Sequence, residues 1–153
     1  MIQLALYKGG TKYDFLVKVR TLSDYTHVAF AMGNIKIESM PFIGVRKAPV
    51  TQFPGKCKID LFDIKGMTKE KGDRIWAWAE SQIGKKYDFW GVFGYAIRFG
   101  KLEEPDKWFC SELCEYGLRL EGFNTTPDRP HYRVSPAWQA KSNLLIPAGS
   151  IWT

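Results

Sequence analysis

The sequence has few of the residues that build catalytic and metal sites. Its 153 residues include only two histidines and three cysteines. Three cysteines cannot all pair with one another, and their spacing matches no disulfide framework, which predicts a reducing compartment. A zinc site needs about four ligands, and no Cys-x-x-Cys or paired-histidine spacing is present. We therefore expect neither a metal ion nor another cofactor.

Long apolar runs are also lacking. The N-terminal run ends at Lys8, and the longest run, at 89–97, is closed by Asp88 and Arg98. Both are too short to span a bilayer, and the first is too short for a signal peptide. No repeat, low-complexity tract or linker divides the chain. We expect one domain over residues 1–153, kept in the cytoplasm.

The chain does have a basic balance, with 22 Lys and Arg against 16 Asp and Glu. A net charge of +6 favours an anionic partner such as nucleic acid, the lipid headgroups of a membrane surface or a cell-wall polymer. The basic residues are scattered, so we expect no specific nucleic-acid binding. Apolar residues make up 45% of the chain, as a packed core requires.

Strand patterns come first in the chain and helix patterns come later. Alternating apolar runs predict strands at 2–7, 26–32, 35–40, 44–48 and 56–64. Helical spacing follows at 68–84, 88–98, 110–120 and 135–145, and 14–20 resembles a short helical turn. This order predicts an α+β fold with a mostly antiparallel sheet packed against helices.

The segment "DKWFCSELCEYGLRLEG", at 106–122, holds two cysteines four residues apart. If the helix begins at Cys110, the unpaired amides and the dipole at its N-terminus stabilise a thiolate there. The alternative is a small buried apolar residue, which free cysteines usually are. Cys114 lies one turn further into the helix, where we expect it to pack.

The strand "THVAFAM" places His27 on one face with Ala29 and Ala31. Gly33-Asn34 predicts a two-residue hairpin turn, because primed turns need positive φ at those positions. In that register Glu38 of the next strand shares the face of His27, where a carboxylate fixes the imidazole tautomer. Ser39 is a second polar candidate. The alternative is a histidine whose neighbours satisfy it without chemistry.

The other histidine, His131, lies in a Pro-rich loop after the cysteine helix. About thirty residues interrupted by proline follow that helix, too few for a core sheet. All the residues expected to form a sheet therefore precede Cys110, which makes His27 the better partner.

The order of five segments resembles a known family. "YTHVAF", a strand ending in "IES", "IGKKYDFWGVFG", "WFCSEL" and "VSPAWQ" are similar to the circularly permuted papain-fold proteins, the YiiX-like members of the NlpC-type superfamily. The resemblance runs from about residue 2 to residue 145. "GVRK" at 44–47 is similar to a segment of the bacteriophage-encoded members, for which the compartment is the host cytoplasm.

The resemblance implies that Cys110 is the nucleophile, His27 the general base and Glu38 the third residue, with Tyr87 near the substrate. It implies a thiol hydrolase or acyltransferase that cleaves a peptide, amide or acyl ester. A non-catalytic binding module of the same fold and a cell-wall endopeptidase are the alternatives. Five aromatic residues either fill the core or line a groove: Trp76, Trp78, Trp90, Phe93 and Tyr95.

Overall fold

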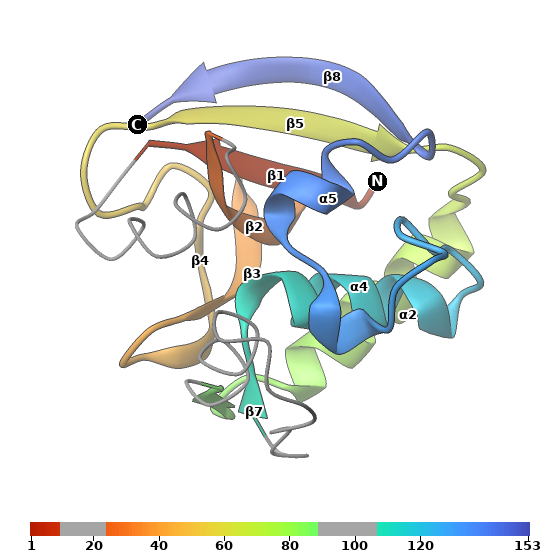
Figure 1. Ribbon diagram of the computed structural model, residues 1–153. Coiled ribbons are helices and arrows are strands. Elements are labelled where there is room, and N and C mark those ends of the chain that lie inside the picture. Colours follow the sequence, from red (N-terminus) through yellow and green to blue (C-terminus); the bar gives the residue numbers. More distant parts are fainter. Residues whose placement is uncertain (10–23, 89–106) are drawn as a thin grey trace.

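The computed structural model describes residues 1–9, 24–88 and 107–153. It is an α+β protein built on a six-stranded antiparallel sheet with the strand order β4-β3-β2-β1-β5-β8. The sheet is strongly twisted, so that β5 and β8 run across the direction of β3 and β4 (Figure 1). The strands are β1 (Gln3–Lys8), β2 (Tyr25–Met32), β3 (Ile35–Met40), β4 (Gly44–Pro49), β5 (Lys58–Ile64) and β8 (Leu145–Trp152).

The first five strands lie where the alternating pattern predicts them. The hairpin register between β2 and β3 also agrees, with Met32 opposite Ile35 and Phe30 opposite Ile37. Gly33 has a φ of 62°, while Asn34 does not have a positive φ. The turn therefore needs the left-handed conformation only at its first central position, where glycine adopts it without strain.

The prediction that every sheet-forming residue precedes Cys110 is wrong. β8 follows all the helices and pairs with β5 at the edge of the sheet. The helix predicted at 135–145 is correspondingly short: α5 covers Pro136–Gln139, with Ser135 as its N-cap. Pro147 and Gly149 within β8 hide the strand pattern, because both residues usually interrupt strands.

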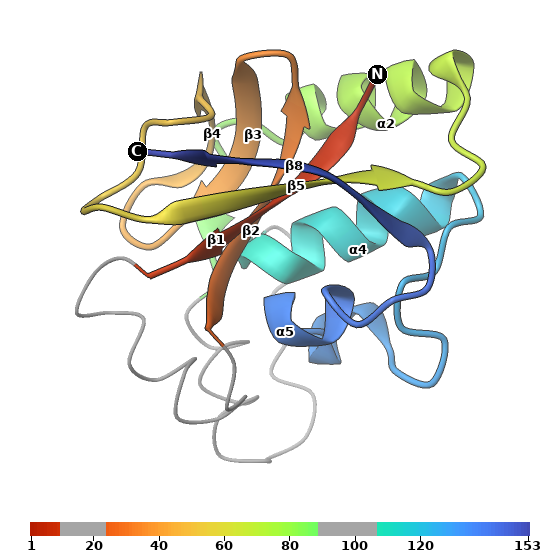
Figure 2. The same cartoon turned by 90° about the horizontal axis from the view of Figure 1, so that it is seen from above.

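Two longer helices lie side by side against one face of the sheet (Figures 1 and 2). α2 (Lys69–Ser81) begins after Thr68, whose side chain accepts a hydrogen bond from the Lys71 amide. α4 (Cys110–Leu120) begins at Cys110, as the sequence predicts. A 3₁₀ turn, η1 (His131–Arg133), lies between α4 and α5.

A small parallel pair of strands leads into α4. β6 (Lys86–Tyr87) pairs with β7 (Lys107–Trp108), an arrangement that the sequence does not predict. The pair lies beside the outer edge of β4, where the Val45 amide donates to the Lys85 carbonyl oxygen. The predicted helical turn at 14–20 and all but Asp88 of the helix at 88–98 lie outside the described residues.

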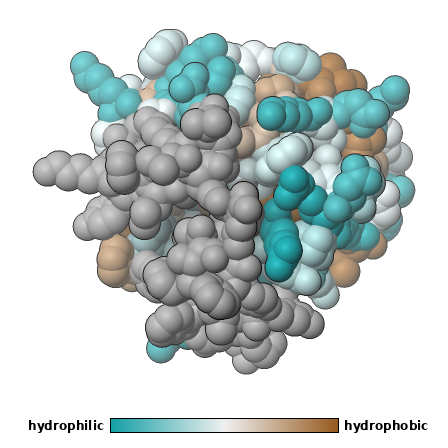
Figure 3. Space-filling view, in the orientation of Figure 1, coloured by the Kyte–Doolittle hydropathy of each residue, from teal (hydrophilic) through white to brown (hydrophobic). Residues whose placement is uncertain are grey.

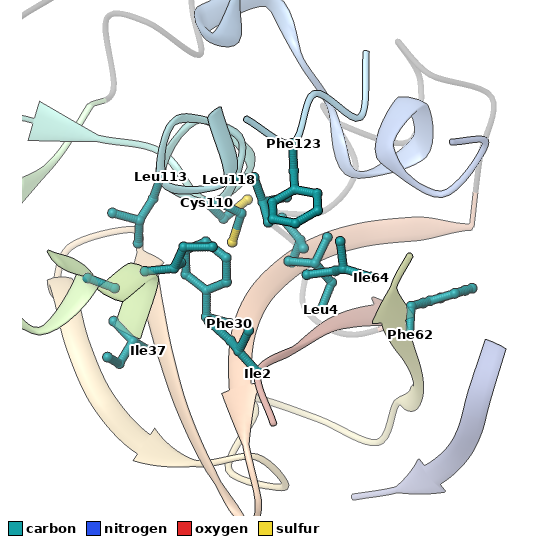
Figure 4. Packing of buried hydrophobic residues seen from close by; sticks show 14 of the residues in the cluster. Ile2, Leu4, Phe30, Ile37, Phe62, Ile64, Cys110, Leu113, Leu118 and Phe123 are labelled. Carbon is teal, nitrogen blue, oxygen red and sulfur yellow. The ribbon is translucent and has the colours of Figure 1, made fainter. Parts of the chain in front are cut away.

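The core has two parts, one on each face of the sheet. The larger part joins α2 and α4 to the sheet through side chains such as Leu4, Phe30, Ile75, Leu113 and Leu118, which are fully or almost fully buried. Figure 4 shows this packing around the start of α4, with the Cys110 sulfur among apolar side chains. The smaller part, on the opposite face, includes Ala5, Tyr7, Ala29, Ala31 and Ile59. Three of these five residues are alanines.

Polar side chains cover much of the described surface in Figure 3, and apolar areas appear mainly at its right-hand side. Among the described residues, no helix has the length and apolar character needed to cross a membrane.

Candidate active site

The start of α4 is fixed to the sheet on one side and to the later loop on the other. Ser39 of β3 donates a hydrogen bond of 2.5 Å from its hydroxyl to the Trp108 carbonyl oxygen, two residues before Cys110. Ser111 donates in the same way to the Val134 carbonyl oxygen at 2.6 Å. Both serines are buried, so the position of Cys110 is held by bonds that water does not weaken.

Cys110 lies at the open end of this helix. Its N-cap, Phe109, has no side chain that can accept a bond from the first-turn amides. These amides and the helix dipole favour negative charge at the Cys110 position. Cys110 is a free cysteine and is 8% exposed.

The His27 ring bridges Glu38 and Cys110. Its Nε2 atom is 2.8 Å from Oε2 of Glu38, and the Cys110 side chain is near enough to raise the pKa of the ring. With Nε2 donating to the carboxylate, Nδ1 is the ring nitrogen left for the sulfur. This tautomer leaves a lone pair on Nδ1, which can accept the thiol proton.

The charges around His27 favour its protonated form. Burial lowers the pKa of the ring, but the negative charge and hydrogen bond of Cys110 and those of Glu38 outweigh burial and raise it to about 9. His27 is therefore cationic near neutral pH, where it favours negative charge on a neighbouring group.

The Glu38 carboxylate is fully buried and contacts three basic side chains. Oε2 is 2.7 Å from Lys36 Nζ as well as 2.8 Å from His27 Nε2. Oε1 accepts two bonds from Arg46, from Nε at 3.0 Å and from Nη2 at 2.9 Å. Burial raises the pKa of Glu38, but His27 and Lys36 lower it to about 2. Glu38 is therefore an anion across the physiological range.

Lys36 is itself fully buried, which is rare for lysine unless it is paired. Besides Glu38, its Nζ atom donates to the Gln52 carbonyl oxygen at 2.8 Å. It also lies 4.7 Å from the Tyr7 ring centre and 5.3 Å from that of Phe53. Burial lowers its pKa and Glu38 opposes that effect.

The aromatic rings of Tyr7 and Phe53 pack against the His27 ring and the Lys36 ammonium group. Their rings stack at 4.7 Å, and each ring centre lies 5.3 Å from that of His27. These two rings limit the rotation of the imidazole and of the lysine.

The structure brings together three of the four predicted site residues: Cys110, His27 and Glu38. The ladder between β2 and β3 ends at Phe30–Ile37, so side chains rather than a paired backbone make the contact between His27 and Glu38. The fourth residue, Tyr87, pairs with Trp108 in the small parallel sheet, two residues before Cys110. Ser39, the second polar candidate, bonds the Trp108 backbone instead of His27.

Cys114 and His131 lie away from the cluster of Cys110, His27 and Glu38. Cys114 is fully buried among core side chains, and burial raises the pKa of its thiol well above the usual value. His131 lies against another part of α4: its ring contacts Tyr116, and its Nε2 is 3.8 Å from Oε1 of Glu112. Packing accounts for Cys114, as the sequence predicts.

Sequence reasoning missed Lys36 and Arg46. Lys36 stands two positions before Glu38, so the strand period that points Glu38 to the His27 face points Lys36 there too. Arg46 lies directly opposite Glu38 in the β3–β4 ladder. Finding it requires the register across the turn at 41–43, which Pro41 and Gly44 indicate as a turn without fixing how β3 and β4 pair.

Among residues 1–9, 24–88 and 107–153, no three His, Cys, Asp or Glu side chains gather as a metal site would require.

No protein-family model matches the chain, and no curated protein matches it.

Proposed function

We propose that the protein is a cysteine hydrolase or acyltransferase with Cys110 as nucleophile, His27 as general base and Glu38 as the residue that orients His27. The observation that carries this proposal is one imidazole that is bonded to a buried carboxylate and lies near a thiol at a helix start. The ordered segments that resemble the permuted papain-fold proteins support the same assignment. Nucleophile, base and orienting group in contact are the arrangement that activates a thiol.

The proposed reaction is acyl transfer through a thioester. The thiol proton moves to Nδ1 of His27, and the sulfur attacks the carbonyl carbon of an amide or ester. The tetrahedral intermediate then breaks its bond to the leaving nitrogen or oxygen, which takes the proton from His27. Water or another acceptor gives a proton to His27 and attacks the thioester, releasing the acyl product and the thiolate.

The developing oxyanion needs hydrogen-bond donors. The backbone amide of Cys110, at the helix start, is suited to be one of them. Tyr87 is proposed to contact the substrate, because its partner in the parallel pair immediately precedes Phe109 and Cys110.

The proposed substrates are peptides, amides or acyl esters. A net charge of +6 favours substrates presented on an anionic membrane surface, host protein or cell wall. The three free cysteines agree with action in a cytoplasm, that of the host if the protein is phage-encoded.

Thiol alkylation tests the proposal without a known substrate. Iodoacetamide labelling, read by peptide mass spectrometry between pH 5 and 9, should find one fast-reacting thiol, at Cys110. The reaction should disappear in Cys110→Ala, persist in Cys114→Ala and fall at least tenfold at pH 6 in His27→Ala, because the imidazolium no longer stabilises the thiolate.

A binding module of the same fold is the second candidate. The low exposure of Cys110 and His27, 8% and 4%, is the observation that favours it. Uniformly slow labelling of Cys110 at pH 6, or rates that His27→Ala leaves unchanged, would replace the enzymatic proposal with this one.

Within the enzymatic proposal, clearing of purified bacterial sacculi separates the substrate classes. Clearing by the native chain but not by Cys110→Ala would identify a cell-wall endopeptidase. Absence of clearing together with a fast thiol would favour a peptide or acyl substrate inside the cell.

A further inference from the structure

The two fixed cations beside Glu38 take part in no step of the proposed reaction. Lys36 and Arg46 nevertheless occupy the carboxylate as fully as His27 does, at 2.7 Å and 2.9 Å. Burying a lysine costs free energy unless its charge is matched. The charge of Lys36 is matched by the group that it contacts, the Glu38 carboxylate.

Together the two cations fix the orientation of Glu38. Arg46 takes Oε1 with two donors, while Lys36 shares Oε2 with His27. If the carboxylate rotated, at least one of these bonds would be lost within a buried site. Oε2 is thereby held in front of the Nε2–H group of His27.

Lys36 is in turn held from behind. The Gln52 carbonyl oxygen and the Tyr7 and Phe53 rings surround its ammonium group, and the side chain is fully buried. It cannot turn away to solvent, whereas the Arg46 side chain is 23% exposed. Lys36 is therefore the more rigid of the two supports.

We propose that Lys36 and Arg46 are positioning residues: they hold Glu38 ionised and aimed at His27, and their charges set the pH range in which the thiolate–imidazolium pair exists. This inference rests on the proposed function for its catalytic meaning, but the geometry of the carboxylate exists without it.

The charge count gives the direction of the effect. With thiolate and imidazolium formed, Cys110 and Glu38 carry two negative charges, against three positive charges on His27, Lys36 and Arg46. The excess cation stabilises the thiolate and opposes protonation of His27. The ion pair has a lower pH limit, where the Cys110 thiol loses its proton, and an upper pH limit, where the His27 imidazolium loses its proton. Removing either fixed cation should therefore raise both limits.

Other titratable groups face the cluster from the packed elements. They are Tyr7 on β1, Cys57 ahead of β5 and Cys114 on α4. Burial raises the pKa of both Tyr7 and Cys114, so these two groups stay uncharged near neutral pH and leave the count unchanged.

The test compares Lys36→Met with Lys47→Met. Lys47 is a neighbouring surface lysine that pairs with Glu80, so its loss gives the same charge change away from the site. Two readouts are measured against pH: the alkylation rate of Cys110, and the ¹⁵N NMR titration of His27, one of only two histidines in the chain.

In Lys36→Met, both limits of the alkylation profile should move up by about one pH unit, and the His27 titration should move with them. Lys47→Met should leave both in place. If Lys36→Met lowers the stability of the protein or the maximal alkylation rate of Cys110 but leaves both pH limits unmoved, Lys36 has only a structural role. That result would overturn the inference.

Arg46→Gln keeps the test decisive if Lys36→Met does not fold, because Arg46 is partly exposed and its loss opens no sealed cavity. It should shift both readouts in the same direction, and an unmoved His27 titration would overturn the inference. A slow wild-type thiol would overturn the proposed function instead, while the His27 titration still decides the role of the two cations.

Discussion

Glu38 is the buried carboxylate around which the charged side chains of the site gather. Its side chain is completely buried, and every charge that balances it comes from a side chain within hydrogen-bonding distance. Such a carboxylate does not act alone: its removal leaves His27 and Lys36 buried without their anionic partner. Its contribution to stability and its contribution to chemistry can therefore be separated by changing partners together.

Glu38→Leu should lower the free energy of unfolding by about 3 kcal/mol, because it leaves Lys36 buried without its carboxylate. Adding Lys36→Met to the same chain should recover most of that loss, since the pair is then replaced by apolar side chains of similar size. Urea denaturation of the two single variants and the double variant measures the coupling. Additive losses would show that the two charges do not depend on each other.

For single residues, the sequence predicts which side chains belong to the site better than it predicts the groups that they contact. A histidine that shares one strand face with two alanines, and a carboxylate on the next strand, predicted the contact between His27 and Glu38. The alternation that supports this contact also buries Lys36, yet lysine is so seldom buried that composition argues against it. Only the packed sheet shows that the charges compensate one another.

α4 packs closely against both the sheet and α2. At Gly117 a side chain would have no room: a Cβ atom would lie 2.7 Å from Cζ3 of Trp78 and 3.0 Å from two ring atoms of Phe30. The glycine thus permits a close approach of the helix that carries Cys110 to the strand that carries His27.

Gly117→Ala should destabilise the protein by about 1–2 kcal/mol. The better helix propensity of alanine, about 1 kcal/mol, does not offset the overpacking against two aromatic rings. Gly72→Ala in α2 is the comparison, because there the nearest contact of a Cβ atom is Cγ2 of Ile2, at 3.0 Å, so the overlap is smaller and the two effects nearly cancel. Thermal unfolding of both variants measures the difference; equal melting temperatures would contradict the close approach.

Elements with a clear period could be predicted, and those without one could not. The first five strands and α2 and α4 have strong patterns and recognisable turns or caps, such as Gly33 and Thr68. β8 does not, because Pro147 and Gly149 interrupt it and six of its eight residues are exposed at the edge of the sheet. β6 and β7 have two residues each, too few for any period.

For the whole molecule, the shifted groups predict how stability depends on pH. The pKa of His27 rises from 6.5 to about 9 on folding, so its stabilisation is complete below pH 6.5 and is lost as pH rises through 9. The pKa of Glu38 falls from 4.5 to about 2, so its stabilisation is complete above pH 4.5 and is lost as pH falls through 2. Asp60, whose pKa is also lowered, acts in the same direction as Glu38.

The free energy of unfolding should therefore be greatest between about pH 4.5 and 6.5. His27→Gln should remove most of the decline between pH 6.5 and 9, whereas His131→Gln should retain it. Urea titrations at a series of pH values give the two curves. A decline of the same size in His27→Gln and the native chain would show that the imidazole gains no proton affinity on folding.

The arrangement of the site along the chain has a consequence for synthesis on the ribosome. His27 and Glu38 belong to strands that emerge early, and β5, the last of the first five strands, ends at Ile64. Cys110 emerges only after a further helix, and it comes near His27 only when α4 docks on strands β1 to β5, while the edge strand β8 emerges last. Under the proposed function, a nascent chain therefore carries no activated thiol until α4 has docked.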